Sequence, residues 1–322
     1  MGLRVNGTRI AAATALAVLA ALVCAVAAPR PAGALRSGGN VAPRYDRAFK
    51  CDLVERLPGP PELVIFGGSR AQRFEPSIAE ALTGLSTFNF AVQNSRPEDA
   101  YAMASWLFRR APGVKLRCFW ALQATTLSDS PLHPGLLAEQ RLNQFLPAGL
   151  VADQREAGVS SQGREMPVFD EYSARGLLVR GSYDVRLERG RPFATTLRNY
   201  LSALVPRAGA PSPYTRTRAE GYFERTLRLF NRHGVEPVLV IMPYHPAALA
   251  AFRAVGWDTK ADAFKAYLES LRGTYRFQML DYTELASFHG DPDAFYDGAH
   301  VKAANARRIL RRAVRDAPGA FL

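Results

Sequence analysis

Five short, predominantly apolar runs, separated by segments with helical periodicity, restrict this chain to few folds. The runs predict strands at 63–66, 87–92, 116–122, 235–242 and 277–282. Helices are expected at 75–82, 97–110, 215–233, 261–272 and 301–314. Strands that are apolar on both faces are typical of a parallel sheet covered by helices on both sides. The sequence therefore predicts an α/β fold with a mostly parallel sheet.

The first 34 residues differ in composition from the rest of the chain. They combine a basic start, an apolar run over 10–28 and the small-residue site Ala32-Gly33-Ala34. These features predict a signal peptide, and the apolar run is also long enough for an uncleaved membrane anchor. Either alternative places the remaining chain outside the cytoplasm, secreted or anchored to the membrane by residues 1–34.

Two further segments interrupt the pattern of strands and helices. Residues 35–60 are rich in Gly, Pro and Arg and are expected to form a linker, so the domain is expected over 61–322. Within the domain, the stretch at about 128–213 is polar and weakly periodic. It predicts an insertion near the carboxyl edge of the sheet, where ligand-binding loops collect.

The chain is strongly basic, with a formal charge of +12. Its arginines are scattered and do not alternate with aromatic residues, so the pattern does not favour a nucleic-acid surface, and no nucleic-acid partner is expected. In an exported protein, anionic envelope polymers or lipid headgroups are better partners for this charge.

Cysteine usage leaves two alternatives. Cys24 lies in the predicted leader, so Cys51 and Cys118 remain for the domain. An even pair in an oxidising compartment favours a disulfide, whereas the apolar strand around Cys118 favours two buried thiols.

A serine follows the first predicted strand directly. Gly67, Gly68 and Ser69 come after the apolar run, and a helix is expected a few residues later. This order would present the Ser69 hydroxyl at the carboxyl end of the strand, where backbone N–H groups can face a developing oxyanion. Gly-Gly-Ser is also a common turn, so the motif alone is a weak signal.

A second motif, Phe295-Tyr296-Asp297-Gly298-Ala299-His300, precedes the last predicted helix. A serine hydroxyl needs a base at neutral pH, and a neutral imidazole held in one tautomer by a carboxylate supplies it. His300 and Asp297 are three residues apart and can converge on one serine. In the alternative interpretation, Asp297 caps the last helix and His300 is a surface residue.

Together the two motifs resemble the SGNH/GDSL hydrolase superfamily, with Gly-Gly-Ser at 67–69, Asp-x-x-His at 297–300 and Asn-Ala-Arg-Arg-Ile-Leu at 305–310. The resemblance covers about 63–126 and 235–315. It implies a flavodoxin-like three-layer α/β/α sandwich, with Ser69 as nucleophile, His300 as base and Asp297 orienting it. The phrases GGSRAQRFEPS and FNFAVQNSRPEDA are most similar to envelope members related to polysaccharide O-acetyltransferases and D-alanyl-teichoic-acid transfer proteins.

The chain departs from this family at the positions that bind the oxyanion. Gly-Asp-Ser is replaced by Gly-Gly-Ser, the glycine after the second strand by Asn94, and the asparagine after the third strand by Gln123 or Thr125. An amide or hydroxyl can still donate a hydrogen bond, and removal of one such donor typically lowers the rate by about 10²–10³. We therefore expect Gly68, Asn94, Gln123 and Thr125 to face the oxyanion or the substrate.

Two basic side chains have open roles. Arg70 is expected either to bind an anionic group of the substrate or to form a structural salt bridge. His245, after the strand at 235–242, is either a substrate contact or a loop residue between Pro243 and Pro246. The sequence contains no convincing metal-ligand spacing, phosphate-binding loop or dinucleotide fingerprint, so neither a metal nor a cofactor is expected.

These observations predict an extracytoplasmic serine ester hydrolase or O-acyltransferase. Its expected substrate is an acylated carbohydrate or envelope polymer, and a membrane acyl-transfer protein is a candidate partner. An alternative is a non-catalytic envelope protein of the same fold that binds polysaccharide or organises an acyl-transfer complex. An ordinary secreted lipase or carbohydrate esterase is a further alternative.

Overall fold

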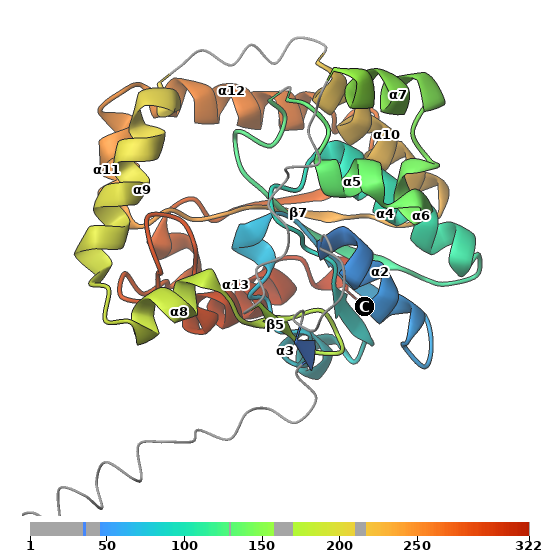
Figure 1. Ribbon diagram of the computed structural model, residues 1–322, viewed down its shortest axis with the longest axis horizontal. Helices are drawn as coiled ribbons and strands as arrows, with labels where there is room; N and C mark the ends of the chain where they lie inside the picture. The colour runs from blue at the N-terminus through green and yellow to red at the C-terminus, as the bar shows by residue number, and fades with distance from the viewer. Residues whose placement is uncertain (1–34, 37–45, 129, 158–169, 210–216, 322) are drawn as a thin grey trace, which may run out of the picture. The chain divides into compact units, whose positions relative to one another are not determined.

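The computed structural model describes residues 35–36, 46–128, 130–157, 170–209 and 217–321 (Figure 1). These residues belong to one compact unit, Leu35–Leu322. The predicted leader at 1–34 lies outside the described residues. Within the described ranges, no helix is both long and apolar enough to cross a membrane.

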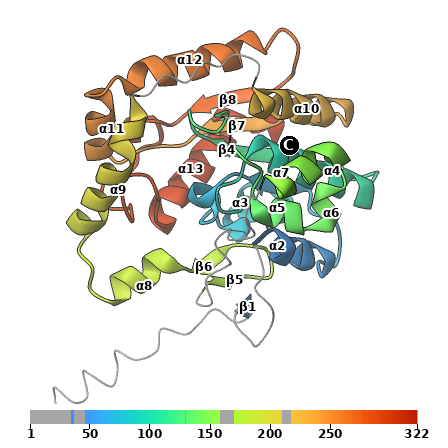
Figure 2. The same cartoon turned by 45° about the horizontal axis from the view of Figure 1, so that its top comes forward.

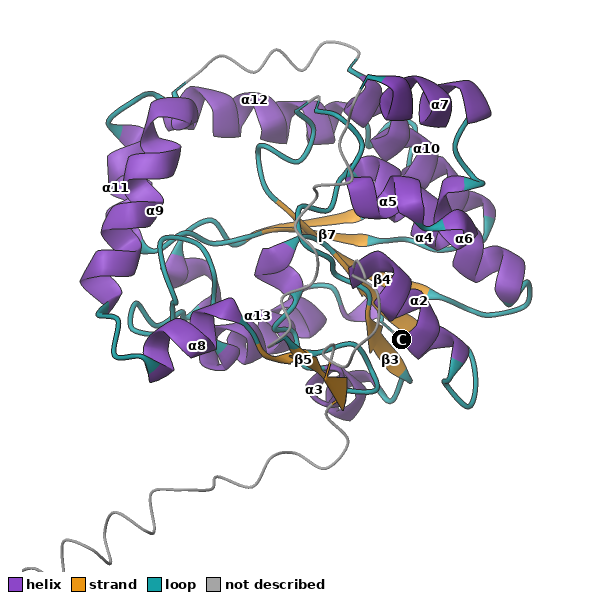
Figure 3. Cartoon of the chain, in the orientation of Figure 1, coloured by secondary structure: helices purple, strands orange, loops and turns teal. Residues whose placement is uncertain are grey.

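A parallel sheet forms the centre of this unit (Figure 3). Its strands are β2 (Leu63–Phe66), β3 (Thr87–Asn89), β4 (Arg117–Leu122), β7 (Val238–Ile241) and β8 (Gln278–Asp281). They lie in the order β3-β2-β4-β7-β8, with every neighbouring pair parallel. In chain order this is the 2-1-3-4-5 arrangement of flavodoxin-like folds. The predicted α/β fold and its five strands are confirmed.

Helices cover both faces of the sheet and separate the buried residues into two cores. The helices expected from the periodicity are α3 (Pro76–Thr83), α4 (Pro97–Arg110), α10 (Arg218–Arg232), α12 (Trp257–Ser270) and α13 (Ala303–Asp316). Val64 and Phe66 of β2 belong to the core that α4 and α10 cover, whereas Leu63 and Ile65 belong to the core under α3 and α13. The alternation of side chains along a strand produces the three layers.

Helix α2 (Asp46–Glu55) corrects the predicted linker at 35–60. It buries Phe49, Leu53 and Val54 in the core beside α4. The segment has a polar composition although much of it is buried, because some of its buried residues are charged. Arg47 is fully buried and donates two hydrogen bonds, of 3.0 and 3.1 Å, to the carboxylate of Asp99. A buried charge that is paired in this way cannot be distinguished by composition from an exposed one.

Cys51 on α2 and Cys118 on β4 are both buried free thiols, so the disulfide alternative is wrong. Burial raises the pKa of both thiols. They act as small apolar residues of the core.

The stretch at 128–213 is richer in helix than its composition suggests. It contains α5 (Pro134–Ala138), α6 (Gln140–Asn143), α7 (Ala148–Glu156), α8 (Ser182–Glu188) and α9 (Phe193–Ala208). It also supplies β5 (Glu171–Tyr172) and β6 (Leu178–Arg180), which form an antiparallel sheet with β1 (Leu35–Arg36). Helix α9 packs against α11 (Pro246–Arg253), and α8 lies at the opposite end of α9 from α12 (Figure 2).

Candidate active site

A turn after β2 presents Ser69 at the carboxyl end of the sheet. Gly67 has a φ of +148°, and a Cβ there would lie 2.9 Å from the Cβ atoms of Ala71 and Ala121. Only glycine fits this position. The chain then enters a short 3₁₀ helix, Ser69–Ala71, so the side chain of Ser69 is half-buried at the edge of a cavity.

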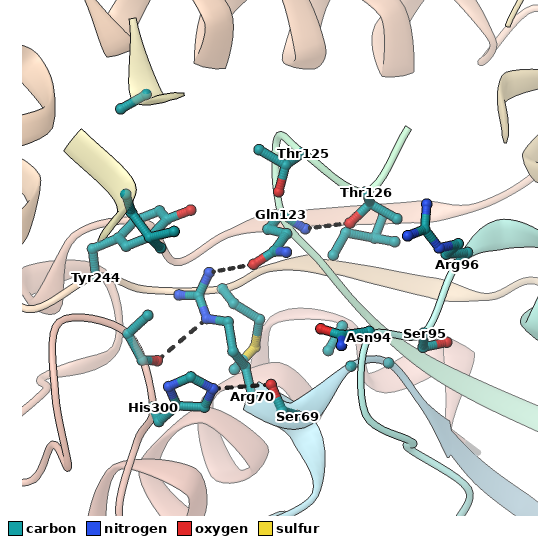
Figure 4. Close-up of a pocket in the computed structure, with 18 of the residues that line it drawn as sticks. Ser69, Arg70, Asn94, Ser95, Arg96, Gln123, Thr125, Thr126, Tyr244 and His300 are labelled. Atoms are coloured by element: carbon teal, nitrogen blue, oxygen red, sulfur yellow. Dashed lines mark hydrogen bonds between the residues drawn. The ribbon is translucent and has the colours of Figure 1, made fainter. Parts of the chain in front are cut away.

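Ser69, His300 and Asp297 are connected by hydrogen bonds, and Figure 4 shows the one between Ser69 and His300. Ser69 Oγ and His300 Nε2 are 2.9 Å apart. His300 Nδ1 is 2.9 Å from Asp297 Oδ2 and 3.0 Å from Oδ1. The two motifs, 231 positions apart in the sequence, meet as a serine–imidazole–carboxylate series.

The environment of Asp297 keeps it ionised. Burial alone would raise the pKa of Asp297, but the His300 charge and hydrogen bonds from His300 and from the backbone of Ala299 outweigh it and lower the pKa to about 2. Oδ1 accepts the backbone N–H groups of Ala299 and His300 at 2.8 and 2.9 Å. The carboxylate therefore closes its own loop and does not cap α13, which begins at Ala303.

An ionised carboxylate at Nδ1 selects one tautomer of His300. It requires a proton on Nδ1, which leaves the lone pair of Nε2 directed at Ser69 Oγ. This is the state in which an imidazole can accept a proton from the serine.

His245 is not among the residues that line the cavity, which favours the alternative in which it is a loop residue. Its ring packs against Phe193 and Phe295, and its Nδ1 accepts the backbone N–H of Ala247 at the start of α11. Its backbone N–H donates to the carbonyl of Gly298 at 3.0 Å. His245 thus supports the loop that carries Asp297 and His300.

Asn94 lies beside Ser69 in the same cavity (Figure 4). Its φ is +49°, the left-handed conformation that asparagine tolerates better than most residues. Within the described part of the chain, no acceptor is found for the backbone N–H of Asn94 or of Ser69. Both groups are available as donors at the predicted oxyanion position.

The missed helix α2 holds the loop before Asn94. Arg47 donates to the carbonyl of Gln93 at 2.7 Å, and the Asp46 carboxylate accepts the N–H of Gln93. Asp46 also binds Arg47 at 2.9 Å. Two residues of the predicted linker, Asp46 and Arg47, therefore hold the loop on one side of the candidate site.

Arg70 forms no salt bridge with any described residue, so the alternative of a structural ion pair finds no support there. Its buried guanidinium donates to the carbonyls of Ala299 and Pro243 and lies 4.3 Å from the ring centre of Tyr244. It also donates to Gln123 Oε1 at 3.1 Å (Figure 4). Because arginine can only donate, this bond leaves the NH₂ group of Gln123 free to serve as a donor.

The cavity has a volume of about 340 Å³ and includes the predicted residues Gly68, Ser69, Arg70, Asn94, Gln123, Thr125 and His300. Thr125 is exposed in the loop after Gln123, and the neighbouring Thr126 hydroxyl accepts the N–H of Gln123 at 2.9 Å. The other lining residues include five aromatic residues that the sequence did not indicate: Trp120, Tyr200, Tyr244, Phe252 and Trp257.

Tyr183 is a further residue that the sequence did not indicate. Its hydroxyl lies 2.9 Å from His300 Nδ1, and the two ring centres are 4.6 Å apart. Tyr296 stacks on Tyr183 and donates to Asp184 at 2.7 Å. The only sequence signal was the Gly-Ser-x-Asp pattern at 181–184, which is typical of a helix start.

No group of His, Cys, Asp and Glu within the described residues is arranged to hold a metal ion. No protein-family model matches the chain, and no curated protein matches it significantly. Any functional assignment therefore rests on the geometry of this site and on the sequence motifs.

Proposed function

We propose that this chain is a serine-dependent ester hydrolase or O-acyltransferase with SGNH-type catalytic residues. The observation that carries the proposal is the series Ser69–His300–Asp297, with Oγ 2.9 Å from Nε2 and Nδ1 2.9 Å from the carboxylate. A helix cap and a surface histidine would not require a serine hydroxyl at this position.

In the first half-reaction, His300 Nε2 accepts the hydroxyl proton while Ser69 Oγ attacks the acyl carbonyl carbon. Asp297 stabilises the resulting imidazolium and does not itself take the proton. The backbone N–H groups of Ser69 and Asn94 and the Gln123 amide are the candidate donors to the oxyanion. When the tetrahedral intermediate collapses, the proton on His300 passes to the leaving alcohol oxygen, and the acyl group stays on Ser69.

In the second half-reaction, an acceptor hydroxyl replaces the alcohol. It gives its proton to His300 and attacks the ester carbonyl, after which the proton returns to Ser69 Oγ. Water as the acceptor gives a hydrolase, and a sugar hydroxyl gives an O-acyltransferase. The choice depends on which acceptor the aromatic cavity holds and how well it excludes water.

The cellular setting is part of the same proposal. The basic, apolar and small-residue features of 1–34 support an extracytoplasmic location, secreted or membrane-anchored. The motifs around Ser69 and Asn94 support an acylated envelope polysaccharide as substrate and a membrane acyl-transfer protein as partner.

The test is trapping of the acyl-enzyme. Purified protein is incubated with p-nitrophenyl acetate, product release is followed by absorbance, and the protein is examined by intact and peptide mass spectrometry. We expect turnover and an acetyl adduct on the peptide that contains Ser69, both lost in Ser69→Ala. Ser77→Ala, which removes an exposed serine of α3, is the matched control. Turnover that persists without Ser69 would overturn the mechanism, and absence of both signals would favour a binding protein of this fold.

A further inference from the structure

The cavity beside Ser69 is lined by charges of a single sign. Three arginines line it, Arg70, Arg96 and Arg207, and no acidic residue among those described does so. Its other walls include Trp120, Tyr244 and other aromatic side chains. Positive charges in a cleft with walls of low dielectric constant focus the potential and concentrate anions.

Arg96 differs from the other half-buried arginines of the described chain. Arg73 binds Asp184, Arg141 binds Glu139, and Arg218 binds Glu98. The guanidinium of Arg96 has no hydrogen bond or ion pair with a described residue, and its Nε is buried.

The two acids that act on the charge of Arg96, Asp99 and Glu98, each pair with another arginine, although the buried Oε2 of Glu98 has no hydrogen-bond partner among the described residues. Asp99 accepts two hydrogen bonds from Arg47, and its Oδ2 also accepts the backbone N–H of Arg96 at 2.9 Å. Glu98 binds Arg218 at 2.8 Å. Burial lowers the pKa of Arg96, so its charge would be stabilised by an external anion.

Arg96 and Arg207 carry positive charges on the cavity walls that form no ion pair with a described acidic residue. Arg96 lies on the side of Asn94 and Ser95, across the cavity from Tyr244 (Figure 4). Arg207, at the end of α9, is exposed, and its guanidinium has no hydrogen bond or ion pair within the described ranges. The Arg70 guanidinium donates hydrogen bonds to carbonyl and amide oxygens and lies over the Tyr244 ring, with no acidic partner among the described residues.

We propose that the saccharide on which Ser69 acts is acidic, and that Arg96 binds its carboxylate or phosphate within this cavity while Arg207 attracts further anionic groups of the same chain. The inference rests on the proposed acyl-transfer function for the identity of the substrate. The planar guanidinium of arginine suits both anions because it donates two parallel hydrogen bonds to either.

Binding to the Ser69→Ala variant separates this inference from catalysis. The probes are an oligosaccharide of uronic acid residues, its carboxyl-reduced neutral counterpart, and a glycerol phosphate oligomer. Binding is measured by calorimetry and by the fluorescence of Trp120 and Trp257, which line the cavity. We expect at least one acidic oligomer to bind about tenfold or more tightly than the neutral one. Its affinity should fall as the salt concentration is raised.

Arg96 variants in the same background test the residue. Arg96→Gln should lower the affinity for the acidic oligomer about tenfold or more. Arg96→Lys, which keeps the charge, should lower that affinity less. Arg315→Gln removes an exposed arginine of α13 and is the matched control, expected to change affinity less than about twofold. Thermal unfolding verifies that each variant is folded.

The outcomes distinguish the two proposals. Tighter binding of the uronate identifies a carboxylate ligand, and tighter binding of the glycerol phosphate oligomer identifies a phosphate ligand. Equal affinity for acidic and neutral oligomers, no binding of any oligomer, or equal losses in Arg96→Gln and Arg315→Gln would overturn the anion site. An acid preference without Ser69-dependent turnover would retain the anion site and reject the acyl-transfer function.

Discussion

Replacement of Asp297 by asparagine tests the electrostatics of the site without any substrate. The folded protein lowers the pKa of Asp297 from 3.8 to about 2. Each pKa unit corresponds to about 1.4 kcal/mol, so ionised Asp297 contributes about 2 kcal/mol to the free energy of unfolding. The carboxylate is almost fully buried, with 4% of its surface exposed, so solvent screens this contribution little.

The direction of the pH dependence follows from the lowered pKa. The contribution is fully present above the pKa of the unfolded chain, 3.8, and is lost as the pH falls towards the folded value of about 2. The asparagine side chain of the Asp297→Asn variant does not titrate. The stability difference between wild type and variant should therefore shrink by about 2 kcal/mol between pH 6 and pH 2, and by about 1 kcal/mol already at pH 3.

Urea denaturation, followed by tryptophan fluorescence and far-ultraviolet circular dichroism, measures this difference at pH 6 and pH 3. Asp293→Asn controls for the loss of an exposed carboxylate from the same loop. A difference that is identical at both pH values would refute the argument. If the enzyme proposal holds, Asp297→Asn should also lower kcat by about 10⁴, the loss found when a triad carboxylate no longer selects the tautomer.

Three substitutions near the site and one labelling experiment on the core give further predictions. Tyr183→Phe should lower kcat/KM for p-nitrophenyl acetate by about 2- to 10-fold, because it removes one hydrogen bond near His300 Nδ1 and keeps the stacked ring; an unchanged value would show that the hydroxyl contributes nothing. Arg47→Met should cost about 3–5 kcal/mol in urea denaturation, since it leaves buried carboxylates unpaired, and a loss below about 1 kcal/mol would contradict the buried network. Asn94→Gly should keep activity within about threefold if the backbone N–H is the oxyanion donor, whereas a fall of about 10²–10³ would assign that role to the side-chain amide. Native Cys51 and Cys118 should resist iodoacetamide until urea unfolds the protein, as mass spectrometry can show, because burial raises the pKa of both thiols.

The parallel sheet could be predicted because most of its strands lie in short, predominantly apolar runs. The runs at 63–66 and 235–242 have no other stable place than between two layers of helices. Ser69 and His300 could be chosen as candidate site residues because each belongs to a local sequence motif. Ser69 ends the Gly-Gly-Ser turn, and His300 ends the Asp-x-x-His loop. Their contact follows from the fold, since both motifs lie at the same sheet edge.

The remaining parts depend on tertiary contacts that leave little trace in local sequence. Helix α2 reads as a polar linker because the partner of Arg47, Asp99, is 52 positions away. Tyr183 lies 117 positions before His300, in a segment whose helices show weak periodicity. His245 follows a strand at the edge where substrate contacts are expected. Its ring, however, packs against Phe193 and Phe295, which are distant from it in the sequence.

The distribution of the site along the chain has a consequence for biosynthesis. Arg47 and Asp46 hold the Asn94 loop, whereas Asp297 and His300 come only at 297–300. Because synthesis begins at the N-terminus, Ser69 leaves the ribosome long before Asp297 and His300. Under the proposed mechanism, Ser69 therefore stays unactivated in every partly synthesised chain that still lacks residues 297–300.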